Sequence, residues 1–130
     1  MRALPTIGDV ETAADPNDDP LIPARFDEHT VIFLVRSPDA PEMSEDALDA
    51  LQVEHLTYLR GLKRRGVLIA NGPLAEQTDV RMRGMSVYRL PLDEALGLAR
   101  QDPMVLAGRL VIEGARWMTA EGAARFGPEE

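Results

Sequence analysis

Apolar and polar positions alternate in six blocks along the middle of the chain, and the period of each block predicts the element that it forms. Four short blocks rich in β-branched and apolar residues are typical of strands. Two longer blocks with apolar residues at spacings of three and four are typical of amphipathic helices. In chain order we expect a strand at 30–36, a helix capped by Ser44 and running to about residue 65, strands at 67–71 and 85–90, a helix at 92–101 and a strand at 109–118.

This order of elements predicts an α+β domain of the ferredoxin-like β-α-β-β-α-β kind. Right-handed crossovers would give a four-stranded antiparallel sheet with both helices on one face. In the first strand, the residues that point to one side are apolar, and so are those that point to the other (Val31, Phe33 and Val35 against Ile32 and Leu34). A sheet with one face in water should alternate apolar with polar residues. We therefore expect a second copy of the chain to cover the open face, as a homodimer or a higher oligomer built from it. The alternative cover is the N-terminal arm, which offers few apolar residues.

The pattern divides the chain into a domain at 29–118 and two flanking segments. Residues 1–28 are expected to be a flexible or draped arm, because four prolines interrupt any regular element there. Residues 119–130 are expected to form a short helical extension that Thr119 caps and Gly127-Pro128 ends. The polar stretch at 75–83 is longer than a tight hairpin needs, which is typical of a mobile loop.

Composition narrows the class of protein. The length of 130 residues fits one domain, and 45% hydrophobic residues suffice for a core. The formal charge of −8 disfavours nucleic acids and anionic membranes as partners. No cysteine is present, which excludes disulfides and thiolate chemistry. Acidic residues stand near the N-terminus where a signal peptide would need an apolar stretch, so we expect a cytoplasmic protein.

His55 and Asp102 are the leading candidates for chemistry. His55 interrupts the apolar stripe of the long helix, which is expected to face the sheet. It is either a core histidine bonded to a backbone carbonyl or a general acid or base. Asp102 precedes a proline, which is typical of a helix N-cap; the functional alternative is a carboxylate that orients a histidine.

Four further residues are candidates for substrate binding: Gly72, Pro73, Arg83 and Ser86. Gly72-Pro73 ends a strand, and backbone amides near it could stabilise an oxyanion. Arg83, like Arg81, is either solvated or a ligand for an acidic substrate. Ser86 lacks the context of a catalytic nucleophile. No spacing of histidines and carboxylates indicates a metal site, and no cofactor is expected.

Several segments together resemble the YCII-related domain family. They are a histidine in the first helix (54–56), a strand that ends in Gly-Pro (66–74), Arg83-Gly84, and an Asp-Pro segment that ends in Ala-Gly (102–110). The family pattern has alanine where this chain has Asn71, and an aromatic residue where it has Met104. The resemblance covers residues 30–118. It implies a dimeric α+β barrel whose suspected active site, a histidine–aspartate pair, falls on His55 and Asp102.

The resemblance also implies a class of reaction. Relatives include a dehydrochlorinase that acts on chlorinated hydroxyhydroquinones, and the wider fold includes isomerases and cofactor-free monooxygenases. Our hypothesis is a cofactor-free lyase, dehydrohalogenase or isomerase that acts on a small cyclic or aromatic molecule. His55 would move the proton and Asp102 would orient the imidazole. The alternative is a non-catalytic dimeric domain that binds a small ligand or a protein.

Overall fold

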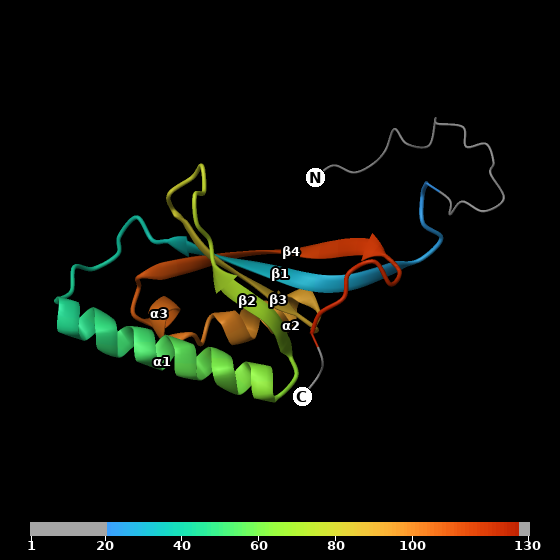
Figure 1. The fold of residues 1–130 in the computed structure, drawn as a ribbon. Helices are drawn as coiled ribbons and strands as arrows, with labels where there is room; N and C mark the ends of the chain where they lie inside the picture. The colour runs from blue at the N-terminus through green and yellow to red at the C-terminus, as the bar shows by residue number, and fades with distance from the viewer. Residues whose placement is uncertain (1–20, 128–130) are drawn as a thin grey trace. The chain divides into compact units, whose positions relative to one another are not determined.

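The computed structural model describes residues 21–127 and shows a four-stranded sheet with three helices (Figure 1). The sheet has the order β2-β3-β1-β4, and β3 runs antiparallel to both β1 and β2. This arrangement confirms the predicted α+β, ferredoxin-like fold. The elements are β1 (Phe26–Arg36), α1 (Glu45–Arg64), β2 (Leu68–Pro73), β3 (Met82–Tyr88), α2 (Leu92–Ala99), α3 (Pro103–Leu106) and β4 (Leu110–Ala120).

Helix α1 begins and ends where its sequence favours it. The Ser44 hydroxyl accepts a hydrogen bond from the backbone N–H of Ala47 at 3.1 Å, which satisfies one of the free donors of the first turn. Acidic residues in the first turn and basic residues in the last turn complement the helix dipole. Gly66 takes a φ of +79° just past the end, a conformation that favours glycine.

The three helices lie on one face of the sheet, where the core forms (Figure 1). Ile32, which is fully buried, packs there against residues of α1 and α2. Gly114 of β4 allows close packing at this point, because a Cβ at this position would lie 2.9 Å from Ile32 Cδ1 and 3.1 Å from Leu92 Cδ1. The other buried members of the cluster around Ile32 are Leu59, Leu62, Leu68, Tyr88, Ala95 and Ala99.

The opposite face of the sheet carries apolar side chains that none of the three helices covers. Gly114 faces the helices, so strand alternation places Val111 and Trp117 on the other face of β4. Val111 is 41% exposed and Trp117 is 36% exposed.

Among the described residues, no helix is both long and apolar enough to span a bilayer.

The first strand and the C-terminal segment differ from expectation. Residues 1–20 of the predicted arm and 128–130 of the predicted C-terminal helix lie outside the described residues. Within the described part, β1 begins at Phe26 rather than at residue 30. The predicted C-terminal helix is wrong there, since β4 runs to Ala120 and a turn follows. Strand-like bonding explains the difference: the N–H of Glu121 donates to the carbonyl of Arg25 at 3.1 Å.

Contacts divide the chain into two units, Met1–Glu28 with Met118–Arg125, and His29–Trp117 with Phe126–Glu130. In the first unit, the N–H of Gly122 donates to a carboxylate oxygen of Asp27 at 2.8 Å. The second unit contains all three helices and all of the candidate site residues.

Candidate active site

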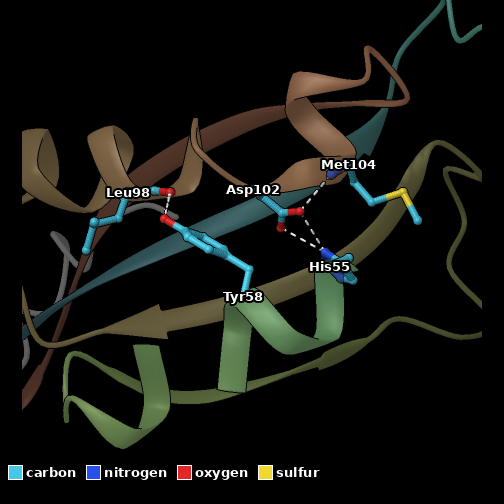
Figure 2. A network of polar contacts seen from close by, with 5 residues as sticks. All are labelled: His55, Tyr58, Leu98, Asp102 and Met104. Atoms are coloured by element: carbon cyan, nitrogen blue, oxygen red, sulfur yellow. Dashed lines mark hydrogen bonds and ion pairs between the residues drawn. The ribbon is translucent and has the colours of Figure 1, made fainter. Parts of the chain in front are cut away.

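His55 of α1 and Asp102 form a close, buried pair (Figure 2). The imidazole Nδ1 lies 2.8 Å from each of the two carboxylate oxygens. Asp102 is only 2% exposed and His55 is 9% exposed, so the pair is largely shielded from water. An ionised carboxylate can only accept hydrogen bonds, so opposite such a group Nδ1 is the donor. A neutral ring that donates from Nδ1 carries its lone pair on Nε2.

A helix cap holds the carboxylate of Asp102 in place. Asp102 is the N-cap of α3, and its Oδ1 accepts a hydrogen bond from the backbone N–H of Met104 at 2.9 Å. Pro103 occupies the first helical position, where its missing N–H is not needed. The cap and the histidine contact therefore use the same carboxylate. The two readings of Asp102 that the sequence left open are compatible.

Tyr58 joins the histidine helix to the segment that carries Asp102. Its hydroxyl donates to the backbone carbonyl of Leu98 near the end of α2 at 2.6 Å, one turn along α1 from His55 (Figure 2). Burial, and then the negative charge of Asp102, raise the pKa of the Tyr58 phenol above its ordinary value. The hydroxyl thus stays protonated and keeps donating, which restrains α1 relative to α2.

A cavity of about 330 Å³ opens beside the pair, between α1 and the sheet, and His55 forms part of its wall. Most of the rest is apolar, including Leu34 and Leu59. Arg36, Arg83 and Arg109 also line it. The volume suits a molecule with one ring. Other lining residues are Leu48, Gln52, Leu56, Asn71, Gly72, Pro73, Gly84, Met85, Ser86, Met104 and Leu110.

Five of the six candidate residues line this cavity, and the sixth, Asp102, contacts His55. Gly72 and Pro73 of β2, with Ser86 and Arg83 of β3, line the same cavity as His55. Ser86 pairs with Asn71 of β2 in the sheet. The sequence did not single out the lining residues Arg36 and Arg109, because each looks like an ordinary charged residue at a strand end. Only the pairing of β1 with β4 brings their strand ends together.

Arg81, the other arginine considered for substrate binding, is not among the lining residues of the cavity. Its guanidinium donates to both carboxylate oxygens of Asp79, at 3.1 and 2.8 Å. These hydrogen bonds lower the pKa of Asp79 to about 2. This pair lies in the loop before β3, whereas Arg83 of β3 lines the cavity.

His29, the other histidine of the chain, lies within β1. It is half-buried, and its ring centroid lies 5.2 Å from that of Phe126 and 6.5 Å from that of Trp117. Its position before a strand resembles that of a loop residue in sequence alone, but β1 extends past it. His29 does not line the cavity.

Residues 21–127 contain no group of three or more histidine and carboxylate side chains placed to hold a metal ion. His55 and Asp102 are one histidine and one carboxylate, and they contact each other directly.

A family model establishes the lineage of the domain. The model of the YCII-related domain matches residues 30–113, which is more than half of the chain. The chain belongs to the YCII-related domain family. The match includes part of β1, all of α1, β2, β3, α2 and α3, and both members of the His55–Asp102 pair.

No curated protein matches the chain. A solved structure of 5-chloro-2-hydroxyhydroquinone dehydrochlorinase from Burkholderia phenoliruptrix, in complex with 2,5-dihydroxybenzoquinone, is similar with a TM-score of 0.49 and 21% sequence identity. The similarity covers 68% of this chain and 92% of the dehydrochlorinase.

Proposed function

We propose that this YCII-related domain is a cofactor-independent acid–base enzyme that acts on a small cyclic or aromatic molecule. The observation that carries the proposal is the buried contact of 2.8 Å between Asp102 and Nδ1 of His55, a residue that lines a cavity. A histidine that served only the core would need no carboxylate and no opening. A histidine paired with a carboxylate beside a cleft is typical of a catalytic site.

His55 is the proton carrier in this proposal, and Asp102 is its positioning residue. Asp102 holds the proton on Nδ1, so the lone pair of Nε2 is available to a substrate. When Nε2 takes a proton, the ring becomes a cation, and the carboxylate at 2.8 Å stabilises that charge. The burial of Asp102 strengthens this interaction, because little water screens it.

The reaction is an elimination or an isomerisation. In the elimination, Nε2 removes a proton from a carbon or hydroxyl of the substrate. The electron pair left behind forms a new double bond, and a leaving group such as halide departs with the electrons of its own bond. In the isomerisation, the imidazolium returns the same proton to a different atom. Neither sequence needs an external oxidant or reductant.

The other predicted residues would hold the substrate. Ser86 and Arg83 line the cavity with His55 and offer a hydroxyl and a guanidinium to an oxygen on which negative charge develops. Gly72 and Pro73 complete the wall along β2 without adding bulk.

We also propose that the domain works as a homodimer through the sheet face opposite the helices. Val111 and Trp117 on that face are both more than one-third exposed. Large exposed apolar side chains on one sheet face are typical of a protein interface. A second copy of the same face would be self-complementary.

The test compares substitution of His55 with the same substitution of His29, the histidine outside the cavity. The protein is incubated in D₂O with a panel of small cyclic ketones, lactones and halogenated hydroquinones, each with and without a carboxylate substituent, and ¹H NMR follows loss of C–H signals and formation of products. We expect conversion with the native protein and with His29→Gln, and none with His55→Gln. Conversion that is equal in His55→Gln, with circular dichroism unchanged, would contradict the proposal. Binding of panel members without any conversion would favour a ligand-binding domain instead.

A further inference from the structure

Among residues 21–127, the cavity beside His55 is lined by three arginines and by no aspartate or glutamate. Arg36 ends β1, Arg83 lies at the start of β3, and Arg109 directly precedes β4. Arginines from three separate parts of the chain thus line one small space, in a chain whose formal net charge is −8. Asp102, the nearby carboxylate, is engaged by the imidazole and by its cap. The local field of the cavity is therefore the reverse of that of the whole chain.

The arginine side chains are not neutralised within the described part of the chain. None of the ion pairs among residues 21–127 includes Arg36, Arg83 or Arg109. Arg109 donates one guanidinium nitrogen to the carbonyl of Pro41, and Arg83 donates one to the carbonyl of Val80. These backbone contacts restrain two of the guanidinium groups while leaving other N–H donors on each.

We infer that the substrate of this site is a small organic acid, whose carboxylate these arginines bind while its reactive carbon faces His55. The inference rests on the proposed function and specifies its substrate class. A planar guanidinium matches the two oxygens of a carboxylate, which makes arginine well suited to recognise it. The apolar wall, which includes Leu34 and Leu59, takes the hydrocarbon part. Removal of a proton creates further negative charge, which the same arginines stabilise.

A pair of probes of nearly equal size isolates the effect of charge. Benzoate and benzamide both carry one ring, which the cavity of about 330 Å³ accommodates. Titrations of ¹⁵N-labelled protein are followed by NMR through the arginine Nε–H and His55 ring signals. We expect benzoate to bind at millimolar concentration or better, about tenfold more tightly than benzamide. Equal affinities, or no binding of benzoate in the millimolar range, would overturn the inference.

Substitutions assign the effect to residues. Arg36→Gln and Arg109→Gln should each weaken benzoate binding by roughly three- to tenfold and leave benzamide unchanged. Arg100→Gln is the matched control, because Arg100 is exposed and lines no part of the cavity. An equal loss of benzoate affinity in Arg100→Gln would show that only net charge matters and would contradict the inference.

His55→Gln separates this inference from the proposed function. The variant keeps all three arginines, so it should still prefer benzoate to benzamide. If it retains conversion of the panel, the proposed function fails while carboxylate binding stands. If it loses conversion but the native protein does not distinguish the two probes, only the present inference fails.

Discussion

Replacement of Asp102 by alanine should destabilise the domain far more than replacement by asparagine. Alanine removes the N-cap of α3, where the carboxylate accepts the Met104 N–H at 2.9 Å, a loss of about 1 kcal/mol. It also leaves the Nδ1–H of His55 without its acceptor in a 9% exposed position, which costs about 1–3 kcal/mol. The free energy of unfolding should fall by about 2–4 kcal/mol in total. Asparagine is as good an N-cap and fills the same space, so Asp102→Asn should cost about 1 kcal/mol or less.

Urea unfolding followed by circular dichroism measures this difference, and thermal unfolding should agree. A change of 1 kcal/mol moves the melting temperature of a small domain by about 4 °C, so Asp102→Ala should melt roughly 10 °C below the native protein. His55→Ala in the Asp102→Ala background should add little, because the two side chains depend on one contact. Equal midpoints for Asp102→Ala and Asp102→Asn would refute this account of the cap and the histidine contact.

Three other predictions concern stability and assembly. Gly114→Ala should lower the free energy of unfolding by about 1–3 kcal/mol through overpacking. Gly97→Ala should raise the free energy of unfolding by roughly 0.5–1 kcal/mol, because Gly97 lies in helix α2 and its added Cβ would meet nothing within 4 Å. Urea unfolding of the two variants distinguishes these effects. Burial raises the pKa of Tyr58 and Tyr88, so the stability that their neutral phenols contribute is complete below about pH 10 and falls as the pH rises beyond it. Substitution of both residues by Phe should reduce this alkaline loss of the free energy of unfolding, measured by urea unfolding at several pH values. The same dependence of that free energy on pH in the double variant would contradict the prediction. Trp117→Glu should convert the proposed dimer to monomer in sedimentation velocity, and an unaltered dimer would place the interface elsewhere.

The order of the elements followed from the sequence because each has a clear hydrophobic period. The boundaries were less accurate where pairing decides them. Strand β3 begins at Met82 rather than at residue 85, because Gly84 pairs with Pro73 of β2. Polar residues near a loop give no signal for such pairing. The C-terminal helix was mispredicted for the same reason, since bonds to a distant segment kept the chain extended.

The candidate site was only partly accessible to sequence reasoning. The position of His55 in an apolar stripe indicated its burial, and the Asp102-Pro103 pair indicated a cap. Their contact spans 47 residues, so no local pattern could reveal it; the family resemblance pointed to it. The convergence of Arg36 and Arg109 depends on strand order, which sequence periodicity does not report.

The central claim is that Asp102 holds the proton of His55 on Nδ1 and leaves the Nε2 lone pair available to a substrate. Long-range ¹H–¹⁵N NMR of the imidazole nitrogens, recorded above the pH at which the ring titrates, reads this directly. The account predicts a protonated Nδ1 and an unprotonated Nε2 in the native protein, and a shift toward protonated Nε2 in Asp102→Asn. A native ring protonated on Nε2, or tautomers unaffected by Asp102→Asn, would contradict it.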